Sequence, residues 1–276
     1  MSETLLQFAA FRQPVIIAAA AMAGTTAPVT LAGTMALVNA EILATIAVTQ
    51  MICPGLPVVY GSQSCSADMK TGQIAIGSAE GALCYKYTAQ LGKAYGLPCR
   101  GGGALTDSRV LNAQAGAESI LTLLAAASEK MNLIFQSAGI MDGYNSISYE
   151  KLMFDFEIIK IVQRYLSDID VSETTLALDV IDEVGIAGEF LSCGHTFAHM
   201  RKEHFFPDLA LRGCSAEDPS TVYAQNIENK LHSMLADYEM PPIEKTVKTA
   251  MEETLYKLGY DKDCVANLTV SESLKI

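Results

Sequence analysis

The sequence predicts an α/β fold built around a parallel β-sheet. A continuous apolar run over 14–21 leads into a turn at Gly24, and an apolar, helix-like pattern follows over 29–51. An uninterrupted apolar run is typical of a parallel strand that is buried on both faces and continues into a crossover helix. The same unit recurs three more times along the chain. Four consecutive strand–loop–helix units favour a (β/α) barrel or an open doubly wound sheet over other classes.

The expected elements alternate along the first part of the chain. We expect strands over 14–21, 56–60, 97–101 and 132–137, and helices over 29–51, 73–95, 110–129 and 148–166. Short polar residues that can cap a helix lie at or near the start of the last three helices, namely Ser78, Asp107-Ser108 and Ser148. These residues indicate where the helices begin.

The pattern changes after the fourth helix. The sequence predicts a short helix over 172–184, a histidine-containing segment with glycine and proline over 185–215, and a long charged helix over about 219–258. No low-complexity linker separates these parts. We therefore expect an α/β body over 1–166 and a helical cap or C-terminal extension over 167–276.

The number of units bears on the architecture. A complete TIM-type (β/α)8 barrel needs eight strand–helix units, and only four are visible, so we expect residues 1–166 to form the C-terminal half of such a barrel. A half barrel leaves two strand edges and apolar side chains uncovered, so we also expect a homo-oligomer. The alternative is a small complete open sheet, but no strand is followed by the Gly-x-Gly-x-x-Gly turn of nucleotide-binding folds.

Composition narrows the classes of function. The 276 residues are 50% hydrophobic, enough for a sizeable core, and the formal net charge of −12 argues against nucleic acid or an anionic membrane as partner. The seven cysteines are odd in number and dispersed, which favours reduced thiols in the cytoplasm over a disulfide framework.

Two apolar segments near the N-terminus have competing interpretations. The run over 15–23 is superficially similar to a signal peptide, but Glu3 lies where positive charge is expected and the run fits the strand repeat. The segment 29–52 is apolar enough to suggest a membrane span, but Asn39 and Glu41 lie in its middle. We expect a packed helix there and no membrane partner.

Residues that can carry chemistry are sought in the loops that follow the strands, where parallel α/β folds place their sites. These loops are rich in hydroxyl, amide and glycine groups and poor in carboxylates. The candidate binding residues in or beside them are Tyr60, Ser62, Arg100, Gly101, Gly102, Thr106, Asp107, Phe135 and Gln136. Arg100 can clamp a carboxylate, and the glycines at 101–103 can bring backbone amides to an anion. Tyr60, Phe135 and Tyr144 offer aromatic faces to a cation.

Each of these candidates also has a purely structural interpretation. An arginine at a strand end often pairs with an acid on a neighbouring strand, and a run of glycines often marks a tight turn. Aromatic residues at such positions are more often core packing than ligand faces. The sequence leaves these alternatives open.

One cluster has metal-like composition, with Cys193, His195, His199 and His204 close in sequence. The spacing of His195 and His199 places both imidazoles on one face of a helix. No third ligand has a secure spacing and the His-Glu-x-x-His pattern is absent, so we expect these histidines to bond to backbone or acidic groups. We expect no metal, nicotinamide or flavin, and we keep His195 as a candidate binding residue.

Several ordered blocks of the sequence resemble the trimethylamine methyltransferase family, to about residue 212. The blocks are MAGTTAPVTLAG at 22–33, NAE at 39–41, PVVYGS at 57–62, GLPCRGGGALTD at 96–107, AQAG at 113–116, SYEK at 148–151 and GHT at 194–196. Members of that family are (β/α) barrels with considerably longer N-terminal parts, so the resemblance agrees with a half barrel and suggests a truncated chain.

The resemblance implies a methyltransferase that moves a methyl group from a methylated amine to the Co(I) of a separate corrinoid protein. The chain itself would bind no cofactor, and the corrinoid (cobalamin) would come from that partner. Family members with pyrrolysine act on trimethylamine, whereas relatives without it resemble glycine betaine methyltransferases. This sequence holds standard residues only, and Gln136 is the position we expect nearest to that of the pyrrolysine. A quaternary, betaine-like amine is therefore the expected substrate.

The chemistry suits the residue types in the loops. A quaternary ammonium is a good methyl donor to a Co(I) nucleophile, because the leaving group departs as a neutral tertiary amine and needs no protein base. The protein then orients the C–N bond and excludes water. The alternative is an inactive barrel fragment, or a scaffold that binds the amine or the corrinoid protein without turnover.

Overall fold

The computed structural model describes residues 2–213, 218–239 and 241–269, and its contacts divide the chain into two units. The first unit covers residues 1–232 and carries all of the described β-strands. The second covers 233–276 and contains helices α10 (Lys245–Lys257) and α11 (Lys262–Thr269).

The centre of the first unit is a four-stranded sheet. Its strands are β1 (Val15–Ala19), β3 (Val58–Ser62), β6 (Cys99–Gly102) and β7 (Leu133–Phe135). All neighbouring pairs are parallel, and the spatial order β1-β3-β6-β7 is also the order along the chain. The predicted α/β class with a parallel sheet is confirmed.

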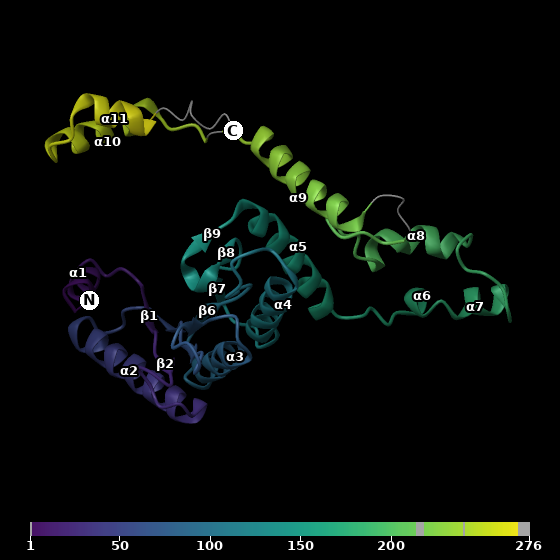
Figure 1. The fold of residues 1–276 in the computed structure, drawn as a ribbon, viewed down its shortest axis with the longest axis horizontal. Coiled ribbons are helices and arrows are strands. Elements are labelled where there is room, and N and C mark those ends of the chain that lie inside the picture. Colours follow the sequence, from purple (N-terminus) through teal and green to yellow (C-terminus); the bar gives the residue numbers. More distant parts are fainter. Residues whose placement is uncertain (1, 214–217, 240, 270–276) are drawn as a thin grey trace. The chain divides into compact units, whose positions relative to one another are not determined.

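A helix follows each strand, as the sequence predicts. These helices are α2 (Leu31–Ile52), α3 (Ala79–Ala94), α4 (Ala113–Ser128) and α5 (Tyr149–Leu166). Figure 1 shows them following one another around the sheet in chain order. Because side chains alternate along a strand, Ile17, Tyr60 and Ile134 lie on one face of the sheet, in clusters with apolar residues of the helices.

The opposite face of the sheet has no helix packed against it among the described residues. Its side chains include Ile16 on β1 and Leu133 and Phe135 on β7, which are 42%, 38% and 39% exposed. β1 and β7 are the two ends of the sheet and each pairs with a single strand. One face and both edges of a parallel sheet, which is normally covered on both faces, are therefore open.

Two of the three predicted capping positions cap a helix in the structure. The hydroxyl oxygens of Ser78 and Ser148 accept hydrogen bonds from backbone amides of α3 and α5, each over 3.1 Å. The start of α4 is capped by Asn112 and not by Asp107-Ser108. The helix expected over 73–95 begins only at Ala79, because the preceding residues form a short strand.

Short strands and one turn lie in the loops beyond the carboxyl ends of the main strands. They are β2 (Met22–Ala23), β4 (Cys65–Ala67), β5 (Ile74–Ala75), the 3-10 turn η1 (Asp142–Tyr144), and the hairpin strands β8 (Ile140–Met141) and β9 (Ser146–Ile147). β2, β4 and β5 form a second small sheet, with β4 and β5 antiparallel. The loops at this end of the sheet are thereby given fixed shapes.

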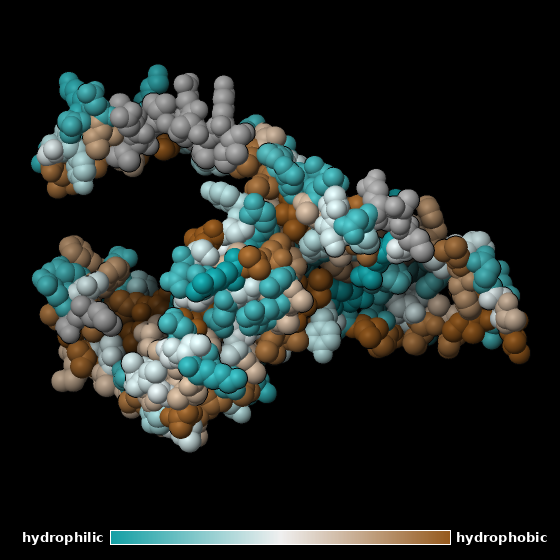
Figure 2. All heavy atoms as spheres, in the orientation of Figure 1, coloured by the Kyte–Doolittle hydropathy of each residue, from teal (hydrophilic) through white to brown (hydrophobic). Residues whose placement is uncertain are grey.

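The helices after α5 differ from the prediction. The helix expected over 172–184 is divided into α6 (Glu173–Leu176) and α7 (Leu178–Val184), because Ala177 takes a left-handed conformation with φ 52°. α8 (Gly194–Glu203) follows. Figure 2 shows hydrophobic side chains along the segment that carries α6 and α7, where Ile169 and Leu178 are exposed.

The prediction of a single long helix over 219–258 is wrong. The structure has α9 (Pro219–Ala236) and then α10, and Pro241 and Pro242 lie between them. Proline lacks a backbone N–H and disfavours helix in the residue before it, which explains the break.

The segment after α5 is attached to the α/β body. Met153 of α5, Leu209 and Ile227 of α9 form a buried cluster, which explains why the contact boundary falls after residue 232. The division into 1–166 and 167–276 stays a prediction.

Helix α2 is long and apolar enough, by length and composition alone, to cross a membrane, and it is the one such helix among the described residues. Its Val38 and Ile42 are buried against β1 and β3. Near its C-terminal end lies α1 (Ser2–Ala10), where Ala9 packs with Cys53 and Leu56. α2 is thus one of the helices that cover the sheet.

Candidate functional site

Side chains from two neighbouring strands, β6 and β7, meet at the open face of the sheet. The guanidinium carbon of Arg100 on β6 lies 4.8 Å from the ring centroid of Phe135 on β7. Arg100 Nη2 donates a long hydrogen bond of 3.4 Å to Gln136 Oε1. The structure thus brings together three residues that the sequence singled out separately.

Arg100 has no carboxylate within ion-pair distance among the residues that the structure describes. Burial lowers the pKa of its guanidinium, and the phenols of Tyr144 and Tyr85 are close enough to oppose that shift. The long bond to Gln136 and the Phe135 ring replace only part of the hydration that this cation loses on burial, and no described carboxylate balances its charge. Its fork of N–H donors is suited to a carboxylate from a ligand.

A group of neutral polar side chains lies beside Arg100. Gln63, directly after β3, donates through Nε2 to the hydroxyl of Tyr85 over 3.2 Å, and also to the hydroxyl of Tyr144. Burial raises the pKa of both phenols, which therefore stay protonated near neutral pH. Gln63 Oε1 is buried and has no hydrogen-bond partner in the described part of the chain.

Sequence reasoning missed part of this group. Tyr144 was considered as a face for a cation, but Gln63 and Tyr85 were not candidates for the site. The position of Gln63, one residue beyond a strand, is a signal that could have found it. Tyr85 lies inside α3 and carries no local signal.

The glycines after Arg100 are needed for close packing. A Cβ atom at Gly101 would lie 2.7 Å from Met131 Cε, and one at Gly102 would lie 2.7 Å from Leu105 Cδ1. Neither has a positive φ, so these two residues are glycine for lack of space and not for an unusual backbone conformation. A role of their amides in anion binding stays a prediction.

Thr106 and Asp107 fasten the same loop to its neighbours. The Asp107 carboxylate accepts backbone hydrogen bonds from Ile76 (2.9 Å) and Gly77 (3.0 Å), and burial raises its pKa. Thr106 donates through Oγ1 to Glu118 of α4 over 2.6 Å. Both side chains have their polar atoms occupied by the protein.

Two further candidates, both on β3, lie on the helix side of the sheet and not beside Arg100. Tyr60 is fully buried on the helix side of the sheet, where its hydroxyl donates to Asn39 Oδ1 over 2.9 Å and burial raises its pKa to about 12. Ser62 is also fully buried, and its Oγ accepts from the amide of Ser64 over 3.0 Å. The packing interpretation is therefore the better one for Tyr60.

His195 lies on α8. Its Nε2 is 3.1 Å from the carbonyl oxygen of Thr174, and its ring stacks on that of His199 with centroids 4.4 Å apart. Within the described residues, no group of three or more histidine, cysteine or acidic side chains is arranged to hold a metal ion. The absence of a metal from the protein stays a prediction.

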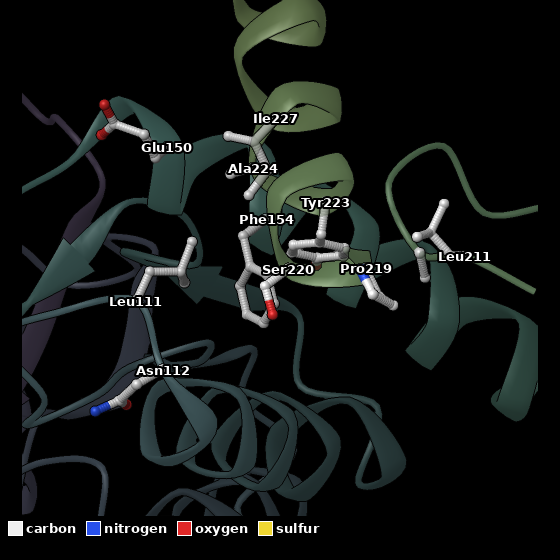
Figure 3. Close-up of a pocket in the computed structure, with 11 residues that line it drawn as sticks. Leu111, Asn112, Glu150, Phe154, Leu211, Pro219, Ser220, Tyr223, Ala224 and Ile227 are labelled. Carbon is white, nitrogen blue, oxygen red and sulfur yellow. The ribbon is translucent and has the colours of Figure 1, made fainter. Parts of the chain in front are cut away.

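A cavity of about 710 Å³ lies between α5 and the start of α9. Its lining is mainly apolar and includes Leu111, Phe154, Leu211, Tyr223, Ala224 and Ile227. Figure 3 shows the rings of Phe154 and Tyr223 next to each other, and their centroids are 6.4 Å apart. None of the residues expected from the sequence lines this cavity, and the charged and polar side chains among its lining residues are Asn112, Glu150, Ser220 and the Tyr223 phenol.

Comparison with known proteins identifies the family. The sequence profile of the trimethylamine methyltransferase (MTTB) family matches residues 1–257. A glycine betaine methyltransferase of Desulfitobacterium hafniense strain Y51 is 39% identical over 94% of this chain and 54% of its own length. A trimethylamine methyltransferase of D. hafniense strain DCB-2 is 32% identical over 96% of this chain and 54% of its own.

A proline betaine:corrinoid methyltransferase of Eubacterium limosum is 35% identical over 88% of this chain and 51% of its own length. The chain therefore spans about half the length of these relatives. The match to the family profile covers nearly all of the chain, in agreement with the sequence blocks that resemble the family. The chain belongs to the trimethylamine methyltransferase family.

Proposed function

We propose that this chain takes part in methyl transfer from a quaternary amine that carries a carboxylate, a betaine, to the Co(I) of a corrinoid protein. The observation that carries the proposal is Arg100, a partly buried guanidinium without a counter-ion in the described residues. Two of the similar proteins are named for betaines and one of them for a corrinoid, which supports the same choice.

The residues around Arg100 fit the two ends of such a substrate. The guanidinium would donate two hydrogen bonds to the carboxylate in a bidentate contact. Phe135 already lies under the guanidinium, so another aromatic face near Arg100 would meet the ammonium, which has no N–H group to donate and binds by charge and apolar contact. The chain would thereby hold one C–N bond in a fixed direction and keep water away from it.

The chain needs to supply neither the nucleophile nor a proton donor or acceptor for this reaction. The corrinoid of the partner protein supplies the nucleophile, whose electron pair forms the new bond to the methyl carbon, while the amine nitrogen keeps the pair of the broken C–N bond. No proton is transferred, which suits a site of phenol, amide and guanidinium groups. Tyr85 and Tyr144 stay neutral because burial raises the pKa of both.

We also propose that the sheet is half of an eight-stranded barrel. Barrels keep their strands in chain order with helices on the outside only, whereas doubly wound sheets carry helices on both faces. The open face and the free edges of β1 and β7 agree with a barrel. On α2, Ala32, Ala36, Ala40 and Ala44 form an exposed row of small residues, as expected where another helix packs.

The open face and free edges of the sheet affect how the isolated chain behaves in solution. Exposed edges and apolar side chains favour self-association, so we expect a homo-oligomer. A monomeric, sharply two-state thermal melt at low concentration would contradict the half barrel.

Arg100 provides the test of the proposed substrate. In the full-length protein, with cob(I)alamin as acceptor, Arg100→Ala should weaken the use of glycine betaine by roughly 2–4 kcal/mol in kcat/KM, as expected for loss of a buried charge contact. Tetramethylammonium, which has no carboxylate, should be affected far less. Arg201→Ala on the exposed surface of α8 is the matched control.

Equal losses on the two donors would remove Arg100 from the substrate site. Binding of glycine betaine without any methyl transfer would favour a scaffold over an enzyme.

A further inference from the structure

Three consecutive residues in the loop after β7 have left-handed backbone conformations. The φ angles of Asp142, Gly143 and Tyr144 are 51°, 58° and 75°. Only glycine adopts this region readily, and a bulky aromatic residue there is a rare exception. Such conformations persist where the surrounding structure holds them, and they cluster at binding and catalytic sites.

The turn is held mainly by the loop that follows Arg100. The amide of Asp142 donates to Ser108 O over 3.0 Å, and the amide of Gly143 donates to Thr106 O over 3.4 Å. Arg109 Nε donates to Asp142 Oδ1 over 2.9 Å. These contacts join the β7 loop to the β6 loop and fix the conformation that the chain alone would avoid.

The result of this conformation is the position of the Tyr144 ring. Its hydroxyl accepts from Gln63, which reaches it from the end of β3. Its phenol is close enough to Arg100 for each group to shift the pKa of the other. The turn, which follows β7, therefore places the Tyr144 ring near Gln63 at the end of β3 and near Arg100 on β6.

We propose that the turn 142–144 is a specificity element, in which Tyr144, held in place by Gln63, contacts the N-methyl groups of the substrate while Arg100 holds its carboxylate. This rests on the proposed betaine substrate and extends it to a second subsite. A cation gains from the face of a tyrosine ring when both are withdrawn from water. Gln63 acts as a positioning residue, because its side-chain amide donates to the Tyr144 phenol while its own oxygen is buried.

Calorimetry with three probes separates the two subsites. Glycine betaine carries both groups, 3,3-dimethylbutyrate has the same shape with carbon in place of the charged nitrogen, and tetramethylammonium lacks the carboxylate. We expect the full-length protein to prefer glycine betaine to 3,3-dimethylbutyrate by about 10-fold. Tyr144→Leu should abolish most of this preference and weaken tetramethylammonium binding, whereas Tyr144→Phe, which keeps the ring, should retain most of it.

Controls distinguish this inference from the proposed function. Gln63→Leu keeps the side-chain volume and should reduce the preference by about 3-fold. Tyr165→Leu, at a tyrosine that is 73% exposed on α5, should change nothing. Arg100→Ala should weaken both carboxylates and spare tetramethylammonium.

If Tyr144→Leu and Gln63→Leu keep the full preference while Arg100→Ala still weakens both carboxylates, the specificity element is refuted and the betaine substrate survives. If the unaltered protein binds none of the three probes, the proposed function fails together with the inference.

Discussion

Lys151→Met should destabilise the chain more than any surface charge substitution. Lys151 and Asp155 are fully buried on α5, with 2.5 Å between Nζ and Oδ1. Lys151 also donates to the carbonyl of Ala104 over 3.1 Å, and Asp155 accepts from the amide of Gly139 over 2.8 Å. The pair thus fastens the β6 and β7 loops, which carry the candidate site, to α5.

The magnitude follows from what the substitution leaves behind. Lys151→Met strands a buried carboxylate and removes the shorter of the two hydrogen bonds to the Ala104 carbonyl, which together cost about 3–5 kcal/mol. The double variant Lys151→Met/Asp155→Leu removes both charges but leaves the Gly139 amide without its partner and Ala104 O with only the 3.5 Å bond from Ser119 Oγ. It should recover about 1–3 kcal/mol of that loss.

The assay is urea unfolding followed by circular dichroism, with the free energy of unfolding obtained by linear extrapolation. The matched control is Lys160→Met, which breaks a surface pair with Asp208 whose side chains are 47% and 40% exposed. That change should cost less than about 1 kcal/mol. Equal costs at Lys151 and Lys160, or a double variant less stable than Lys151→Met, would show that burial of the Lys151–Asp155 pair does not set its effect on stability.

Three further predictions concern the core and the site. Tyr60→Phe removes the hydrogen bond to Asn39, so it should lower the free energy of unfolding in urea by about 1 kcal/mol. The KM for glycine betaine should not change, and a raised KM would mean that Tyr60 contacts the substrate. Gly102→Ala places a Cβ atom 2.7 Å from Leu105 Cδ1, so it should lower the free energy of unfolding by about 1–3 kcal/mol. An unchanged urea midpoint would contradict this packing. Burial raises the pKa of Asp155 to about 6, so between about pH 4 and 6 the folded chain holds a proton that the unfolded chain has released. Its contribution to stability therefore falls as pH rises through this window, and Asp155→Asn should remove that slope from urea titrations.

The alternation of strands and helices could be predicted because it depends on local patterns. Apolar runs and the capping residues Ser78 and Ser148 marked most elements within a few residues. The errors arose where local signals compete. Pairing of 74–75 with β4 shortened α3, and Pro241 with Pro242 divided the last long helix.

The candidate site could be predicted only where its residues follow strands directly. Arg100, Phe135 and Gln136 were found in this way, and the structure brings them together. For Tyr60 the sequence left core packing and a ligand face open, because a strand with an unbroken apolar pattern does not reveal which of its two faces meets the helices; the structure buries it on the helix side. Tyr144 reaches Gln63, on the Arg100 side of the site, through a left-handed turn, and no local pattern predicts that contact.

The most direct test of the account is the choice of methyl donor by the full-length protein. Glycine betaine and trimethylamine are offered separately with cob(I)alamin, and methylation of the cobalt is followed by absorbance. We expect transfer from glycine betaine, with release of the demethylated tertiary amine, and little or none from trimethylamine. Rapid transfer from trimethylamine with none from glycine betaine would contradict the betaine assignment and the role of Arg100 on which it depends.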